Sequence, residues 1–362
     1  MSSNELLEFR TSVRALLSKH ATPAALRTAM DSELGYDPAL WRMLCEQVGV
    51  AALAVPEESG GAGAGLVESL LVVGELGRTL AGVPMLGSAV LGVQAVLLAG
   101  DEQACARLLP DLADGSRTAA LCWADAEGWD TAGVSAAGNA SAAGDLSAAG
   151  GTLSGTAHYV LHGAQSDLLL VLTDNGLFET TAGAPGVTIT PTPALDPTRK
   201  LATITFADTP ATRLGTGDPA ELRTRLREIA WAALAAEQVG AARHCLEMTV
   251  EYTASRVQFG RAIGSFQALK HRMADMYVLV ESAESTALAA AQAVAENSAS
   301  APEDTWVARK HCTEAFSTVA AETIQLHGGI AITWEHDAHL YFKRAHATSE
   351  LFGTGPRPVV AA

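Results

Sequence analysis

One short segment of the sequence combines a cation, amide side chains, aromatic rings and two glycines. It runs from Arg256 to Gln267 and reads RVQFGRAIGSFQ. Arginine neutralises a phosphate through its planar fork, and glycine lets the backbone approach a ligand closely. The segment therefore has the groups needed to bind a pyrophosphate and a planar ring. A plain turn between two helices, with its arginines in solvent, has the same composition and remains an alternative.

A second polar segment reads QLHGGI from Gln325 to Ile330 and is followed by TWEHD from Thr333 to Asp337. The paired glycines Gly328 and Gly329 end a helical pattern, which a simple C-cap would also explain. The histidines nearby could suggest a metal site, but only His336 and His339 have the spacing of neighbours on one helix face. We therefore expect no metal.

Long helices must position both segments. Helical patterns run over Leu222–Tyr252, Gln267–Ala295 and Thr305–Leu326, so the first segment joins two helices and the second ends a third. The first third of the chain is also helical, whereas Ala119–Leu214 has strand patterns: a continuous apolar run at Leu168–Leu172, and alternation later in the region. We expect an α+β protein with a helical domain (1–117), a β domain (118–214) and a helical bundle (215–362).

Composition excludes several classes of protein. Of 362 residues, 48% are hydrophobic and 18% charged, too apolar for a disordered chain and enough for a sizeable core. The net charge of −16 disfavours nucleic-acid binding, which needs a basic face.

The cysteines and the apolar stretches indicate where the protein is found. The 5 cysteines lack C-x-x-C spacing, which is typical of a protein in a reducing compartment. The most apolar stretch, Met85–Ala99, is shorter than the roughly 20 residues of a membrane span. With no export signal visible, we expect a cytoplasmic protein without a membrane partner.

The two segments resemble the C-terminal signatures of the acyl-CoA dehydrogenase family. The first signature reads R-x-Q-F-G-x-x-I-G-S-F-Q-A-x-K-H-x-x-A-D-M from Arg256, and the second reads Q-x-H-G-G-I-x-x-T-W-E-H-D from Gln325. Further matches are Val55-Pro56 with Gly60-Gly61, Glu75-Leu76-Gly77, and Leu195-Asp196-Pro197-Thr198-Arg199. The resemblance implies an N-terminal helical domain, a central β-barrel or sandwich and a C-terminal four-helix bundle.

The resemblance also implies a tetramer with FAD that dehydrogenates an acyl-CoA thioester between its α- and β-carbons. A carboxylate removes the α-proton, and the β-hydrogen leaves as hydride to the flavin. In the family, the two signatures reach the FAD of a neighbouring subunit. By that likeness the FAD-contacting residues are Arg256, Gln258, Phe259, Gln267, Gln325, Gly328 and Gly329.

The sequence departs from the family where the catalytic glutamate belongs. The usual position precedes Gly353-Thr354 and holds Phe352; the alternative position on the long helix holds Ala230. Neither side chain can remove a proton, so the catalytic residue is unknown. Glu237 lies about two turns from Ala230 on a similar face and is a weak candidate. Glu228 and Glu350 are also nearby in sequence.

The β domain departs as well. Family members carry a segment like L-T-E-P-x-x-G-S-D, whose hydroxyls and backbone contact flavin and substrate, whereas Leu121–Asp130 reads LCWADAEGWD. The strand that normally follows, with an aromatic residue over the flavin, is only partly preserved at Gly155–Val160. The half-site for a flavin in this subunit is therefore eroded, while the half-site for a neighbour's flavin is intact.

With one half-site eroded and the other intact, the chain resembles the smaller subunit of actinobacterial heterotetrameric (α2β2) steroid side-chain acyl-CoA dehydrogenases. A homologous partner would then carry the catalytic glutamate, and an electron-transferring flavoprotein is the acceptor that the family implies. Two alternatives remain: a self-sufficient homotetramer with a displaced base, and a scaffolding subunit without flavin contact.

Overall fold

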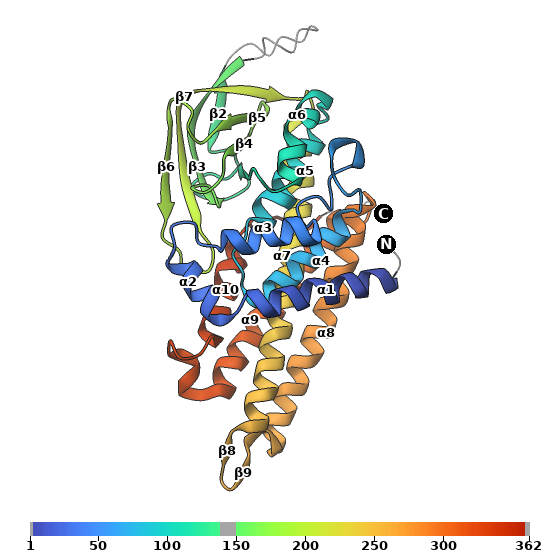
Figure 1. The fold of residues 1–362 in the computed structure, drawn as a ribbon, viewed down its shortest axis with the longest axis vertical. Coiled ribbons are helices and arrows are strands. Elements are labelled where there is room, and N and C mark those ends of the chain that lie inside the picture. The colour runs from blue at the N-terminus through green and yellow to red at the C-terminus, as the bar shows by residue number, and fades with distance from the viewer. Residues whose placement is uncertain (1–2, 138–149, 359–362) are drawn as a thin grey trace.

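The computed structural model describes residues 3–137 and 150–358 (Figure 1). The first region is helical. It comprises α1 (Ser3–His20), α2 (Pro23–Asp31), α3 (Pro38–Val48), η1 (Glu57–Ser59), α4 (Leu66–Thr79), the π-helix η2 (Met85–Gly92), α5 (Val93–Leu98) and α6 (Glu102–Ala113). Thr22, Asp37 and Asp101 cap α2, α3 and α6 with side-chain oxygens that accept backbone N–H bonds.

The middle region forms one mixed sheet with the strand order β1-β4-β5-β7-β3-β2, and β6 pairs with β7. The strands are β1 (Ala119–Cys122), β2 (Val134–Ala137), β3 (Gly150–Leu161), β4 (Leu168–Thr173), β5 (Gly176–Thr181), β6 (Val187–Thr192) and β7 (Leu201–Leu214). Only the β1–β4 pair is parallel among the described strands. Strand β4 is buried along its whole length, which confirms the expectation from its continuous apolar run.

The third region contains α7 (Pro219–Ser255), the hairpin β8 (Val257–Gln258) and β9 (Arg261–Ala262), η4 (Ile263–Ser265), α8 (Gln267–Ala295), α9 (Ala301–His327), η5 (Gly328–Ile332) and α10 (Ala338–Glu350). Asp218 caps α7, and Pro219 occupies its first turn. The three long helices lie side by side, and the hairpin lies at their end farthest from the sheet (Figure 1). The predicted α+β architecture is confirmed. The proposed divisions at 117/118 and 214/215 fall in the connections α6–β1 and β7–α7.

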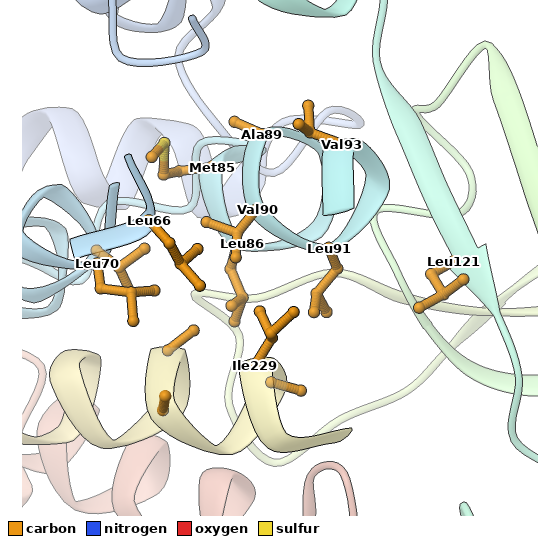
Figure 2. Close-up of a cluster of buried hydrophobic side chains, with 14 of the residues drawn as sticks. Leu66, Leu70, Met85, Leu86, Ala89, Val90, Leu91, Val93, Leu121 and Ile229 are labelled. Carbon is orange, nitrogen blue, oxygen red and sulfur yellow. The ribbon is translucent and has the colours of Figure 1, made fainter. Parts of the chain in front are cut away.

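Small residues let the first and third regions approach closely. A Cβ on Gly240 of α7 would lie 1.8 Å from the carbonyl oxygen of Gly74 on α4. Glycine at both positions therefore allows the two helix backbones to touch. Figure 2 shows the adjoining core, where Leu86 and Val90 of η2 lie toward Ile229 of α7. The apolar stretch that begins at Met85 forms a buried helical segment, π-helical in η2 and α-helical in α5.

A buried ion-pair cluster ties the middle and third regions together. Arg344 of α10 bonds Asp196 of the β6–β7 connection and donates to Glu237 of α7 over 3.0 Å. Arg199 donates to both Glu237 oxygens, at 2.5 and 2.6 Å. Burial alone would raise the pKa of Glu237, but the two guanidinium groups overcome this and hold it below its usual value. All four side chains are buried, and two cations balance two anions.

Replacing Arg344 with leucine should therefore destabilise the fold strongly, because Asp196 and Glu237 would remain buried with too little positive charge. We expect a loss of about 3–5 kcal/mol in the free energy of unfolding, measured by urea denaturation at neutral pH. Arg272→Leu is the control, since Arg272 and Glu322 form a partly exposed pair whose loss costs about 0–1 kcal/mol. Equal losses in the two variants would contradict the role of the cluster.

Candidate half-sites for the cofactor

Both signature segments lie at the same end of the long helices. The hairpin Arg256–Gln267 connects α7 to α8, and the turn Gly328–Gly329 follows α9 (Figure 1). Arg256, Gln258, Phe259, Gln267, Gln325, Gly328 and Gly329 are all exposed. The structure thus brings the predicted cofactor residues to one open surface. Whether they contact FAD stays a prediction.

The geometry of this surface suits a ligand from outside the chain. Phe259 is 91% exposed and has a φ of 53°, an unusual conformation for a bulky residue. A Cβ added at Gly260, Gly328 or Gly329 would meet no atom within 4 Å, so the space above these backbones is open. Arg261 lies over the ring of Phe266, with 4.0 Å from guanidinium carbon to centroid. The surface therefore offers cations, amides and exposed backbone, which fit a phosphate-bearing cofactor.

Aromatic side chains pack together at the second half-site, the one that the resemblance assigns to a flavin of this subunit. Trp123, Trp129, Tyr159 and Phe352 form a cluster that we call the aromatic plug. The centroid of Phe352 lies 5.9 Å from Trp123 and 6.1 Å from Trp129. Trp129 in turn lies 5.3 Å from Tyr159. These are the residues at the eroded segment, the partly preserved strand and the glutamate position, and here they contact one another.

The plug leaves no room for a flavin ring between these residues. A planar ring needs about 3.5 Å to the atoms on each of its faces, and so about 7 Å between flanking rings. The centroid separations at Phe352 are shorter than this. Phe352 is also only 2% exposed. The rings of the plug therefore pack against one another without a gap of flavin thickness between them, whereas the backbones of the hairpin surface are open.

Side chains of helix α7 hold the main chain of the plug through hydrogen bonds. Arg223, Arg227 and Trp231 lie on one face of the helix, four residues apart. Each donates a hydrogen bond to a main-chain carbonyl of the plug, in turn Trp123 (3.3 Å), Trp129 (2.5 Å) and Phe352 (3.2 Å). Sequence reasoning missed these residues, although their spacing along a helix is a readable signal.

Arg309 of α9 holds the loop that carries Phe352. Its buried guanidinium donates to the carbonyls of Gly353 (3.0 Å), Ser349 (2.6 Å) and Leu351 (3.2 Å). These bonds fix the loop while Phe352 adopts a φ of 64° and points into the plug. The three hydrogen bonds that the charged Arg309 donates stabilise the loop and so offset the strain of the Phe352 backbone.

The two half-sites lie far apart within one chain. Trp231, beside the plug, and Arg256, at the hairpin, are separated by most of α7. At the rise of an α-helix this distance is about 37 Å. A flavin ring at the plug of this chain could therefore not lie beside Arg256 of the same chain.

The three candidate carboxylates Glu237, Glu228 and Glu350 differ in their surroundings. Glu237 has both oxygens bonded to Arg199, which is the arrangement of a structural ion pair rather than a free base. Glu228 pairs with Arg225 at 2.5 Å, and burial raises its pKa despite that cation. Glu228 and Trp231 line an open cavity of about 660 Å³. Glu350 is exposed. Ala230 is fully buried, and it and Phe352 have no proton-accepting group.

Two further features concern metals and membranes. Within residues 3–137 and 150–358, the histidine, cysteine and carboxylate side chains form no group of three that could hold a metal ion. None of the helices in these ranges is both long and apolar enough to cross a bilayer.

Comparison with known proteins identifies the family. Residues 3–116 match the family model of the acyl-CoA dehydrogenase N-terminal domain, and residues 229–356 match that of the C-terminal domain. The chain belongs to the acyl-CoA dehydrogenase family. Members of this family are flavin-dependent oxidoreductases that use FAD and act on acyl-CoA.

Individual relatives extend the comparison. The acyl-CoA dehydrogenase IpdE2 of Mycobacterium tuberculosis is 44% identical over 353 residues, covering 97% of this chain and 93% of the relative. Among solved structures, the Tcur3481–Tcur3483 steroid acyl-CoA dehydrogenase is 31% identical with a TM-score of 0.87, covering 97% and 94% of the two chains. The ChsE4–ChsE5 complex from Mycobacterium tuberculosis is 30% identical with a TM-score of 0.85, covering 96% and 93%.

The plug predicts unequal effects of the same substitution at two phenylalanines. Phe352→Ala should lower the free energy of unfolding by about 3–5 kcal/mol, because it leaves a cavity in packed core. Phe259→Ala should change it by about 0.5 kcal/mol or less, because that ring is exposed. Urea denaturation of both variants measures the difference. A small effect at Phe352 would mean that the plug is not packed.

Proposed function

We propose that this chain is one subunit of a heteromeric acyl-CoA dehydrogenase and completes the FAD site of a homologous partner. The aromatic plug carries the proposal, because it occupies the half-site where a flavin of this subunit would lie. The seven exposed signature residues, Arg256 foremost, would contact FAD seated mainly in the partner.

The proposal divides the catalytic work between two chains. FAD takes up the hydride that leaves the β-carbon of the thioester. The base that removes the α-proton would come from the partner, because the sequence resemblance aligns Phe352 and Ala230 with the two positions of the family's catalytic glutamate. In this chain, Arg256 would neutralise phosphate charge, and the glycines would let the backbone approach the cofactor.

The comparisons support a heteromer and suggest a substrate class. Two of the similar structures are named as pairs of chains, and one of them is described as a steroid dehydrogenase. We infer by this likeness an α2β2 assembly acting on the CoA thioester of a steroid side chain. An electron-transferring flavoprotein would accept the electrons. The 5 unpaired cysteines are consistent with the cytoplasm.

Two alternatives are less well supported. A self-sufficient homotetramer needs a base and a flavin seat in this chain, but Glu237 is held by two arginines and the plug fills the seat. A pure scaffold would not need an exposed Phe259 or the open glycine turns of the hairpin surface.

The test is the flavin affinity of the complex formed with a co-expressed homologous partner. Arg256→Ala should weaken flavin binding by about tenfold or more, because a phosphate would lose a charge-assisted bond. The flavin dissociation constant is measured by the fluorescence of released FAD.

Arg42→Ala provides the control, since Arg42 is an exposed arginine on α3, away from the hairpin. It should leave flavin affinity within about twofold of the unmodified complex. Full retention of flavin by the Arg256→Ala complex would favour the scaffold alternative and reject our proposal.

A further inference from the structure

Tyr252 and His327 join the two segments of the hairpin surface. Tyr252 lies in the last turn of α7, and its carbonyl accepts the backbone N–H of Arg256 over 2.9 Å. His327 ends α9, directly before Gly328. Their rings stack with centroids 4.4 Å apart and planes inclined by 25°. We propose that this stack positions the hairpin and the glycine turn relative to each other, so that both can contact one cofactor; this rests on the proposed function.

Cross-helix contacts lead up to the stack. One turn earlier on each helix, the buried hydroxyl of Thr249 donates to that of Thr323 over 3.1 Å. His327 Nδ1 lies 2.8 Å from the carbonyl oxygen of Thr323. Because a carbonyl only accepts, Nδ1 carries the hydrogen and the ring orientation is fixed. The ends of α7 and α9 are therefore held in register.

The loop after the glycine turn folds back onto the stack. His336 lies 4.6 Å from His327 and 6.5 Å from Tyr252, measured between ring centroids. Arg27 of α2 pairs with Asp337 and donates to the carbonyl of Trp334 over 2.9 Å. The stack is thus covered on its outer side by a loop that is anchored on the N-terminal region.

The stack acts behind the contact surface rather than on it. His327 is only 4% exposed, whereas Arg256, Phe259 and Gly328 are exposed. The pair, a buried His327 and a half-buried Tyr252, touches both segments and controls their spacing. Tyr252 and His327 are therefore positioning residues.

The experiment compares Tyr252→Leu with Tyr252→Phe in the co-expressed complex. Leucine removes the ring and should weaken flavin binding by about fivefold to tenfold, the usual scale of one aromatic pair. Phenylalanine keeps the ring and should bind flavin within about twofold of the unmodified complex. Thermal denaturation of the complex accompanies each flavin measurement, and both variants should melt as one cooperative unit.

Two outcomes would overturn the proposal. Unchanged flavin affinity in a folded Tyr252→Leu complex would show that the stack does not position the segments. Equal weakening by leucine and phenylalanine would assign the effect to the hydroxyl group. If Tyr252→Leu fails to assemble, His327→Phe and His327→Leu supply the same contrast from the other ring. Failure of the proposed function would give a different result from failure of this positioning role. In that case the complex with Arg256→Ala would retain its flavin.

A second, independent observation concerns the buried ion-pair cluster. A cavity of about 20 Å³ is lined by His162, Arg199, Glu237 and Arg344 together with apolar side chains. His162 Nδ1 and Arg199 Nη1 of these lining residues are both buried and have no hydrogen-bond partner among the described residues. We infer that one water molecule occupies this cavity and bridges the two atoms.

The two atoms are complementary as partners of a water molecule. His162 Nε2 lies 2.8 Å from the carbonyl oxygen of Gly82, so Nε2 carries the hydrogen and Nδ1 is free to accept. Arg199 Nη1 can only donate. A water that accepts from arginine and donates to histidine satisfies both, and the volume exceeds the roughly 10–15 Å³ that one water needs. The site lies where all three regions of the chain meet.

A crystal structure of the protein tests this site. It should show a solvent peak about 2.6–3.2 Å from both His162 Nδ1 and Arg199 Nη1. In crystals of His162→Leu the peak should disappear, whereas the control His158→Leu should keep it. An empty cavity, or a direct bond between the two side chains, would overturn the assignment.

Discussion

The packing of Phe352 against Trp123 and Trp129 constrains the rest of the site. The loop that carries this ring is held by Arg309, and the tryptophans are held by donors on α7. An aromatic ring therefore occupies the position that the sequence resemblance aligns with the family's catalytic carboxylate, and no gap of flavin thickness remains between the packed rings. Arg223 and Arg227 beside the plug donate to main-chain carbonyls of its tryptophans.

The length of α7 separates the filled half-site from the open one. About 37 Å of helix lies between Trp231 and Arg256, so the two ends of one chain cannot serve the same flavin ring. The open end combines an exposed Phe259 with glycine backbones that no described residue covers, and so is accessible to a second molecule. One chain thus contributes a single end of a composite site. The same separation explains why the open end can be retained while the other is lost.

Local patterns predicted much of this structure. The 3.6-residue periodicity over Leu222–Tyr252 and Gln267–Ala295 predicted α7 and α8, and the apolar run Leu168–Leu172 predicted β4. The position of the signature segments at helix ends also followed from these patterns. The sequence further indicated that Phe352 and Ala230 could not act as bases.

Contacts between distant segments could not be predicted in the same way. The plug joins β-domain residues to a C-terminal loop, and the ion-pair cluster joins Glu237 to Arg199 and Arg344. Helical spacing placed Glu237 near Ala230 but could not show that two arginines engage it. Ring packing and buried ion pairs depend on tertiary structure, so their partners appear only once the chain is folded.

The most direct test of the account is the ratio of FAD to polypeptide. It is obtained from the absorbance of acid-released flavin and the native mass, for the chain purified alone and for the complex with a homologous partner. If this chain supplies only one end of a shared site, the isolated chain holds no stoichiometric FAD and the complex holds one FAD for each pair of unlike chains. One FAD for every polypeptide, or a flavin-loaded homotetramer of this chain, would contradict it.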